Sequence, residues 1–558
     1  MSIDTRAEKP ARLGGNLLGV TMLVVAFVVS LIVSTVNTLR IERPNETIIR
    51  IAHWQLEKGY REALDIAIKE YQRRNPGVKI EQMGVTEKLY NQWINTQLIS
   101  GTAPDLCEMG QSNMLTKDEY TVKYFIPLSN LITRPNPYNA NNNLKDTPWK
   151  ETLLDGMRGG FREGLQEYYG VPTTLISMRL FVNRTLLKQA TGSDALPETF
   201  GEWMAQCRAI REYAKKTGQE RSLIPIVSCY GIQSIKGTYE VPFTSSYERE
   251  LDLDLNGDVL PIETYIGYRK KQVTLQDPSM QALFRSMKMV GDQMQLGFSG
   301  MDRQTAQYTF ANQRAAFLST GSWDASGVAQ QAETSGFDLA VIQMPLPAED
   351  EEFGAYIRGR QNEASSNGAG VYGVYKNSKH AEQALDFMMF LTSREGNEIL
   401  NQNSEWPPLT IGAKPSKLME PFQPDPRGYN ARVSLGFGPR VSQVINAELV
   451  NYFQGFAPFS EFERIYNEVI LDPRRGGDWA WWNEYDLRRR DVRNKERVLA
   501  QDLALELITP GSRDPNRTRR AVLQQLTRYN GTDYLWLFRT EREADPFVAW
   551  KDFQPVFP

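Results

Sequence analysis

The side chains of this sequence that could do chemistry are mostly carboxylates, amides and tryptophans. Only two histidines occur, His53 and His380, which excludes multi-histidine metal cages and leaves little room for a histidine-based triad. Three cysteines, Cys107, Cys207 and Cys229, are too few for a disulfide framework in 558 residues. Phosphate-binding loops, dinucleotide-binding glycine fingerprints, nucleophile elbows and Cys-x-x-Cys pairs are absent from the sequence. No cofactor is therefore implied, and no carboxylate pair is singled out for acid–base catalysis.

One pattern matches a metal site. Oxygen ligands recur at the spacing of an EF-hand calcium loop, namely Asp252, Asp254, Asn256 and Glu263. The alternative is a strand hairpin, because Leu251, Leu253 and Leu255 alternate into an Asn256-Gly257 turn. Pro261 lies inside the would-be loop and argues against its exit helix. We favour the hairpin and expect no metal.

Charge excludes one class of partner. The chain has 64 basic and 67 acidic residues, so its net charge is −3. A global polycationic surface for nucleic acid is therefore not expected. Hydrophobic residues make up 41% and charged residues 23%, as in ordinary globular proteins. The length allows about three or four domains' worth of mass.

The amino terminus contains an apolar run. Residues 17–36 carry no charge over 20 positions, which is long enough to cross a bilayer, and Arg6, Lys9 and Arg12 precede them. This predicts a cytoplasmic head at residues 1–16 and an uncleaved single-pass anchor at residues 17–37. The bulk of the chain would then lie on the periplasmic side of the inner membrane. A cleaved signal peptide and a buried core helix are the alternatives.

The segments that must position any site alternate between strands and helices. Apolar strands are predicted at residues 48–52, 78–81 and 106–109, separated by helices whose apolar residues recur between 60 and 71 and between 90 and 98. This order is typical of a parallel sheet covered by helices, an α/β fold. Thr199 and Glu202 form a capping box that opens a further helix, and strands are predicted at 339–342 and 371–375. Beyond a proline-rich stretch, residues 425–558 are predicted to form a helical C-terminal extension.

Five segments resemble family 1 of the extracellular solute-binding proteins, the sugar-binding receptors of ABC importers. They are GTAPD at 101–105, YGVP at 169–172 with LFVN at 180–183, LPETFGEW at 196–203, FANQRAAF at 310–317 with GSW at 321–323, and KNSK at 376–379 with FLTS at 390–393. Together they span roughly residues 48 to 410 in the expected order. The sequence departs from the family pattern at Arg179, Val182 and Gln313, where a small residue, Tyr and Gly are usual.

The resemblance implies a two-lobed periplasmic-binding-protein-like fold of type II, with ligand in a cleft between the lobes. Residues 48–173 and 347–405 would form lobe one. Residues 174–346 and 406–424 would form lobe two, and the C-terminal extension would pack on it. The lobes would close about the segments that cross between them.

Sugar binding needs flat rings against the apolar faces of the sugar and polar groups against its hydroxyls. Such residues are expected at the carboxyl ends of strands and at the crossings. The candidates are Trp54, Gln55, Glu108, Met109, Gln111, Ser112, Thr173, Trp323, Asn362 and Trp406.

The sequence thus predicts a membrane-anchored binding protein without catalytic activity, which captures a mono- or oligosaccharide and presents it to ABC permease subunits. A ligand-sensing or scaffolding protein that kept the fold without a transporter is the first alternative. A carbohydrate-active enzyme with two carboxylates is the second.

Overall fold

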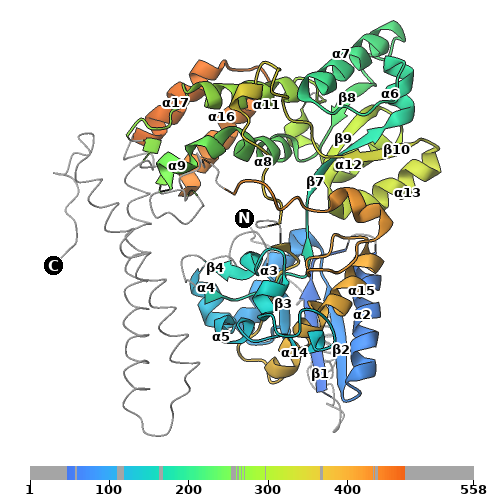
Figure 1. The fold of residues 1–558 in the computed structure, drawn as a ribbon, viewed down its shortest axis with the longest axis vertical. Coiled ribbons are helices and arrows are strands. Elements are labelled where there is room, and N and C mark those ends of the chain that lie inside the picture. Colours follow the sequence, from blue (N-terminus) through green and yellow to red (C-terminus); the bar gives the residue numbers. More distant parts are fainter. Residues whose placement is uncertain are drawn as a thin grey trace, which may run out of the picture.

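The computed structural model describes residues 47–56, 59–109, 118–162, 167–252, 259, 263–264, 267–268, 270–295, 297–364, 368–430, 433 and 438–471. These residues form two α/β lobes, one above the other in Figure 1. The head predicted at 1–16, the anchor predicted at 17–37 and the C-terminal residues 472–558 lie outside the described ranges. Within those ranges, no helix is both long enough and apolar enough to cross a membrane.

Lobe one is built on a four-stranded sheet. Its strands, in spatial order, are β12 (Tyr372–Val374), β3 (Leu106–Glu108), β1 (Thr47–His53) and β2 (Val78–Gly84). Strand β1 pairs in parallel with β2 and β3, whereas β12 is antiparallel to β3. The covering helices include α2 (Tyr60–Arg74), α3 (Glu87–Ser100), α14 (Ala381–Leu391) and α15 (Arg394–Ser404). The strands and helices predicted between residues 48 and 109 are confirmed.

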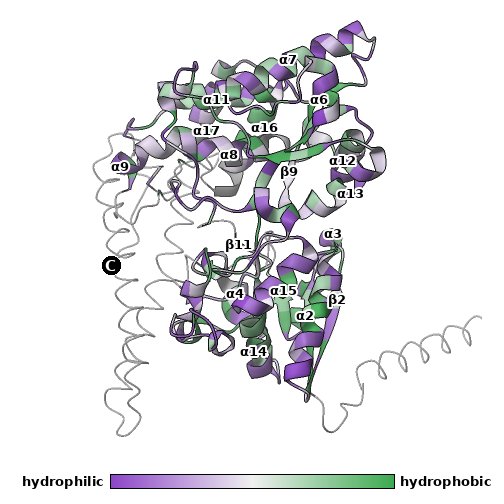
Figure 2. Cartoon of the chain, turned by 45° about the vertical axis from the view of Figure 1, so that its right-hand side comes forward, coloured by the Kyte–Doolittle hydropathy of each residue, from purple (hydrophilic) through white to green (hydrophobic). Residues whose placement is uncertain are grey.

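Lobe two has a second four-stranded sheet. The strands lie in the order β10 (Leu339–Ile342), β7 (Met178–Asn183), β9 (Ala315–Gly321) and β8 (Ile224–Val227). Strand β9 is buried along its whole length, and Figure 2 shows green, hydrophobic ribbon in the strands at the centre of lobe two. One face of the sheet is covered mainly by α6 (Arg184–Thr191), α7 (Phe200–Lys216), α8 (Gly231–Thr244) and α11 (Pro278–Gly291). The other face is covered by α12 (Arg303–Ala311) and α13 (Ala325–Ser335). The predicted capping box of Thr199 and Glu202 opens α7.

In the described part of the chain, three segments connect the lobes. The first crossing, β6 (Thr174–Leu175), pairs antiparallel with the second, β11 (Gly368–Ala369). The third follows Thr410, which bridges Leu153 of lobe one, and precedes the 3-10 helix η9 (Lys417–Phe422), which packs on lobe two. The lobes are therefore tied by adjacent backbone segments rather than by one flexible linker.

The second and third crossings lie later in the chain than predicted, since the predicted lobe boundaries fall after residues 346 and 405. Pro345 and Pro347 end β10, but the chain turns back over lobe two because Phe353 packs there, with its ring 6.1 Å from that of Phe200. Trp406, expected at the third crossing, is instead in the lobe-one core, 5.1 Å from the ring of Tyr60. Residues 347–363 therefore lie with lobe two, and residues 406–410 lie with lobe one.

The described part of the C-terminal extension packs on lobe two. It consists of α16 (Gly438–Phe453) and α17 (Phe459–Leu471), which form a pair beside α11 (Figure 1). The ring of Phe284 on α11 lies 5.3 Å from that of Phe459 and 5.5 Å from that of Phe462. These helices are therefore part of the hydrophobic core of lobe two.

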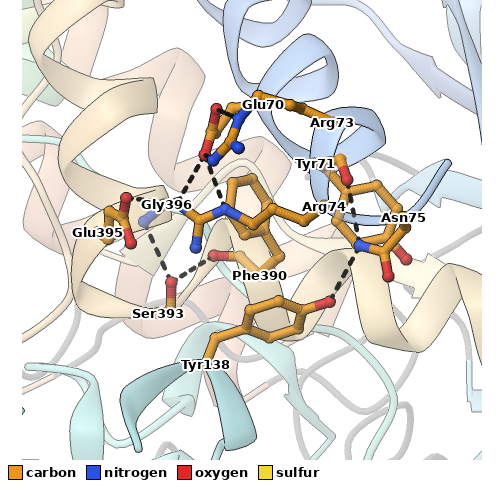
Figure 3. Close-up of polar contacts among 10 residues, drawn as sticks. All are labelled: Glu70, Tyr71, Arg73, Arg74, Asn75, Tyr138, Phe390, Ser393, Glu395 and Gly396. Atoms are coloured by element: carbon orange, nitrogen blue, oxygen red, sulfur yellow. Dashed lines mark hydrogen bonds and ion pairs between the residues drawn. The ribbon is translucent and has the colours of Figure 1, made fainter. Parts of the chain in front are cut away.

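An ionic network ties two helices of lobe one where α2 ends and α15 begins (Figure 3). Glu70 accepts hydrogen bonds from Arg73 at 2.8 and 2.9 Å and from Arg74 at 2.7 Å. Arg74 also donates to Glu395 at 2.5 Å and lies over the ring of Phe390. The hydrogen bonds from the two arginines lower the pKa of Glu70 to about 2. This cluster lies at the other end of α2 from the crossings.

Candidate functional site

The carboxyl ends of strands from both sheets meet the crossing segments. In lobe one, the amide of Met109, just after β3, donates to the carbonyl of Val371, just after β11, at 2.7 Å. In lobe two, the amide of Ser322, just after β9, donates to the carbonyl of Ser177, just before β7, at 2.9 Å. Residues that follow β1, β3 and β9 therefore lie beside the connections between the lobes, where binding sites of α/β proteins are usual.

Glu108 organises the lobe-one side of this region. Its buried carboxylate accepts a hydrogen bond from the amide of Trp54 at 3.1 Å and a short one from the side chain of Gln55. The hydroxyl of Tyr90 donates to the carbonyl of Glu108 at 2.9 Å, and its ring lies edge-on to Trp54 at 5.1 Å. The structure therefore brings together three predicted residues, Trp54, Gln55 and Glu108. Tyr90 was missed, because helical spacing alone marks it as a core residue.

Trp323 occupies the lobe-two side. Its indole N–H donates to the hydroxyl of Tyr230 at 3.0 Å, and the two rings are perpendicular at 5.5 Å. A Cβ on Gly321 would lie 2.3 Å from ring atoms of Trp323, so only glycine lets the indole fold back over this turn. Trp323 is partly exposed, and it packs against the core cluster of lobe one. It therefore joins lobe two to the hydrophobic cluster that fills lobe one and includes Leu175 of the first crossing.

Tyr230 and Asp324 support the position of Trp323. Tyr230 follows β8, and burial raises the pKa of its hydroxyl, which keeps the group protonated beside the indole. Asp324 is buried and accepts hydrogen bonds from Arg303 at 2.6 Å and from the hydroxyl of Thr320. Neither residue was predicted. The apolar run at 223–227 could have indicated a strand and, at its end, Tyr230.

The remaining predicted residues divide by location. Thr173 is fully buried at the first crossing, where its hydroxyl donates to Gly370 at 3.0 Å and its carbonyl accepts from Asn397 at 2.7 Å. Trp406 is buried in lobe one, so neither residue presents its side chain to solvent. Asn362 lies just before the second crossing, with its side chain accepting from the amide of Ala364 at 3.0 Å. Met109 is buried beside Gly170 and Gly373. Gln111 and Ser112 lie outside the described residues.

A pocket of about 270 Å³ adjoins the first two crossings on the side of lobe two. Its wall includes Met178, the cross-strand partner of Gly321, so the pocket and Trp323 lie at the same end of strands β7 and β9. The polar part of the wall contains Arg179, Thr238, Arg360, Gln361, Glu363 and Asp425. Charged and apolar groups together make this pocket suitable for a polar ligand.

Arg179 links all three crossings beside this pocket. Its guanidinium is 1% exposed and donates to both carboxylate oxygens of Glu363, at 2.6 and 2.9 Å. It also donates to the carbonyl of Pro421 at 2.9 Å and lies over the ring of Phe422. Arg179 follows the first crossing, Glu363 precedes the second, and Pro421 follows the third. The family departure noted at Arg179 therefore occurs where the connections between the lobes converge.

Asp155 lies against the second crossing from the side of lobe one. Its carboxylate caps a tight turn by accepting from the amides of Met157 at 2.9 Å and Gly159 at 3.0 Å. A Cβ on Gly368 would lie 2.2 Å from the same carboxylate, so the strand approaches this turn closely. Burial raises the pKa of Asp155 to about 6, although the two amide hydrogen bonds oppose this shift.

The four oxygen ligands of the EF-hand pattern are divided between described and undescribed residues. Asp252 and Glu263 are described, but Asp254 and Asn256 lie outside the described residues. Among the residues that the structure does describe, no group of His, Cys, Asp and Glu could hold a metal ion. The hairpin alternative is wrong at its start, since Leu251 ends the helix α9 (Glu248–Leu251). The three cysteines are free, and burial raises the thiol pKa of Cys107 and Cys207.

The two-lobed mixed α/β fold, with strand ends from both lobes beside the crossings, defines this chain as a periplasmic-binding-protein-like molecule. The chain belongs to the bacterial extracellular solute-binding protein family, whose sequence pattern matches residues 54–398. This is a family of binding proteins rather than enzymes, and the resemblance of the five sequence segments is confirmed.

Individual relatives are distant. The chain is 18% identical over 409 residues to a multiple sugar-binding protein of Streptococcus mutans, covering 71% of this chain and 83% of that protein. A chitin oligosaccharide binding protein has a similar fold, with a TM-score of 0.51, 16% identity and coverage of 76% of this chain and 99% of that one. RafE from Streptococcus pneumoniae in its apo form gives a TM-score of 0.50, 14% identity and coverage of 76% and 97%.

Proposed function

We propose that this chain is an extracytoplasmic binding protein that captures a carbohydrate between its lobes and delivers it to an ABC transporter. Membership of the solute-binding family and the names of the relatives support carbohydrate as the ligand class. The observation that carries the proposal is Trp323, which is anchored in lobe two and packs against the lobe-one core beside the crossings.

The proposed mechanism uses rings and hydroxyls. Trp323 and Trp54 would cover apolar C–H faces of a sugar, while Tyr230 and Gln55 would exchange hydrogen bonds with its hydroxyls. Glu108 acts mainly by holding Trp54 and Gln55 in place. A ligand that touches both lobes stabilises the closed arrangement, because only that arrangement makes both sets of contacts. The closed form would then be the one recognised by the permease.

We propose that the apolar run at residues 17–37 tethers the chain to the inner membrane, with the lobes on the periplasmic side. The chain is proposed to leave its ligand chemically unchanged, since binding is the role of its family. Prolonged incubation with oligosaccharides should therefore yield no shorter products.

Thermal shift of the full chain against a sugar library tests the proposal. The chain should be purified in a detergent without a sugar head group, since such a head group would compete for the site. A sugar present at 100 times its dissociation constant should stabilise the fold by about 2.7 kcal/mol. A library of mono- and oligosaccharides that produces no shift, with calorimetry also showing no binding heat, would refute carbohydrate capture.

A further inference from the structure

The carboxylates that line the pocket beside the crossings already have partners. Both oxygens of Glu363 accept from Arg179. Both oxygens of Asp425 accept from Arg427, at 3.0 and 3.1 Å. Neither acid therefore needs to neutralise a further cation in the pocket.

Arg360, by contrast, has few partners for its charge. Its guanidinium carries five N–H donors, yet toward the described part of the chain it makes one hydrogen bond, from Nη1 to the carbonyl of Met344 at 3.3 Å. Burial lowers the pKa of Arg360, although Glu363 nearby opposes this shift. A half-buried guanidinium without its own carboxylate is costly, and a ligand that supplies one would offset that cost.

The rest of the pocket has the polarity of a sugar site. Thr238 and Gln361 offer groups for hydroxyls, and Met178 and Leu346 offer apolar surface. A volume of about 270 Å³ corresponds to about nine water molecules at roughly 30 Å³ each, which suits a ligand of single-sugar size. Met178 pairs with Gly321, so the pocket lies at the end of strands β7 and β9 that also carries Trp323.

We propose that this pocket binds an acidic sugar and that Arg360 contacts the carboxylate of that sugar. The chain would then prefer uronic-acid-containing saccharides over neutral ones. The inference rests on the proposed function and adds the charge class of the ligand. The guanidinium would bind the carboxylate through two parallel N–H···O hydrogen bonds, a geometry that Lys cannot reproduce.

Calorimetry with matched ligands tests the inference. Each uronate oligosaccharide is compared with its carboxyl-reduced counterpart, which has the same linkages and no charge. The full chain should bind the acid at least tenfold more tightly than the neutral form. Arg360→Met should lower that ratio roughly 10- to 100-fold, as expected for a hydrogen bond between charged groups. Arg360→Lys should give an intermediate ratio.

Arg358→Met is the matched control. Arg358 is exposed two residues away and does not line the pocket, so this variant makes the same change in net charge and should keep the full preference for acid. Thermal melting of each variant confirms that it is folded, and the affinity ratio within one variant is independent of the amount of active protein.

The outcomes separate this inference from the proposed function. Equal affinity for acidic and neutral forms in the unchanged chain would overturn the acidic-sugar inference and leave carbohydrate capture standing. An acid preference of unchanged size in Arg360→Met would also overturn it. Small carboxylates such as acetate or succinate that bind as tightly as the uronates would show a general anion site, again overturning it. Failure of every saccharide to bind would refute both proposals.

Discussion

Trp323 is held by three separate features of lobe two, and this makes its role testable. Gly321 leaves room for the indole, and the hydroxyl of Tyr230 accepts a hydrogen bond from the indole N–H. Asp324, the next residue, is held by a hydrogen bond from Arg303. Such anchoring fixes a large flat ring before any ligand arrives. A preorganised aromatic residue is the kind that dominates binding energy in protein interfaces.

Replacing Trp323 by Ala should weaken carbohydrate binding by about 2 kcal/mol or more, roughly 30-fold, because the ring supplies stacking area that no neighbour replaces. Isothermal titration with the best ligand of the thermal-shift screen measures this loss. Tyr308→Ala removes an aromatic ring that is 67% exposed on α12, and it should leave the affinity unchanged. Equal affinities for the Trp323 variant and the unchanged chain would remove Trp323 from the site.

At this scale the sequence predicted the site unevenly. Trp54, Gln55 and Glu108, which the structure brings together, were predicted because Trp54 and Gln55 follow β1 and Glu108 ends β3, two strands whose apolar runs are easy to read. Tyr230 and Arg360 were missed because their significance depends on partners far away in the sequence, Trp323 and the pocket wall. Gln313 illustrates a different limit. It replaces the family glycine but keeps a left-handed φ of 57°, so a residue change need not alter the backbone.

At the scale of elements, the turn that contains Asp155 presses against the second crossing. A Cβ on Gly159 would meet the carbonyl of Gly368 at 2.9 Å, so this turn and strand are in backbone contact. The carboxylate of Asp155 is thereby kept from solvent, which is why its pKa rises. A titratable group is thus built into the contact between lobe one and a hinge strand.

The Asp155 carboxyl should make stability depend on pH. Its pKa is higher folded (about 6) than unfolded (about 3.8), so the folded state favours the proton. The contribution of Asp155 to the free energy of unfolding is fully present below pH 3.8 and is lost as pH rises through 6. This contribution is at most about 3 kcal/mol. Urea unfolding of the unchanged chain and of Asp155→Asn between pH 3.5 and 7 measures it. As pH rises, the free energy of unfolding of the unchanged chain should fall relative to that of Asp155→Asn. A difference between the two that does not change with pH would contradict a raised pKa for Asp155.

Element prediction succeeded where the pattern is local and failed where the chain turns back on itself. The helix α7 was predicted from its capping box and apolar stripe, both contained within the helix. The crossings were misplaced because Pro345 and Trp406 resemble element boundaries in the sequence. The course of the chain is instead determined by two contacts, between Phe353 and Phe200 and between Trp406 and Tyr60. In each contact the two residues are more than one hundred positions apart in the sequence.

At the scale of the whole molecule, Arg179 is the residue that ties the connections between the lobes together. It bonds to segments adjoining the second and third crossings from its own place beside the first. Breaking a buried ion pair leaves a charge without its partner, which is strongly destabilising. The relation between the lobes should therefore depend on this one guanidinium.

Arg179→Met should lower the free energy of unfolding by about 3 kcal/mol, since Glu363 would lose its bidentate partner. Adding Glu363→Gln should recover part of the loss, because the orphaned charge is then removed. Arg285→Met breaks an ion pair with Glu352 in which both side chains are 59% exposed, and it should cost less than about 1 kcal/mol. Chemical denaturation compares the variants, and equal costs for Arg179→Met and Arg285→Met would rule out a special role for Arg179.

The interleaving of the lobes along the chain also bears on how the protein is made. Lobe one needs residues up to Thr410 to complete its sheet and core, and lobe two needs residues up to Leu471 for the helices that seal it. A nascent chain emerging in order from the ribosome therefore cannot finish either lobe until most of its length has been synthesised. Long-range strand pairing of this kind folds slowly. Folding should accordingly be largely post-translational, with a long interval in which chaperones can hold the polypeptide unfolded.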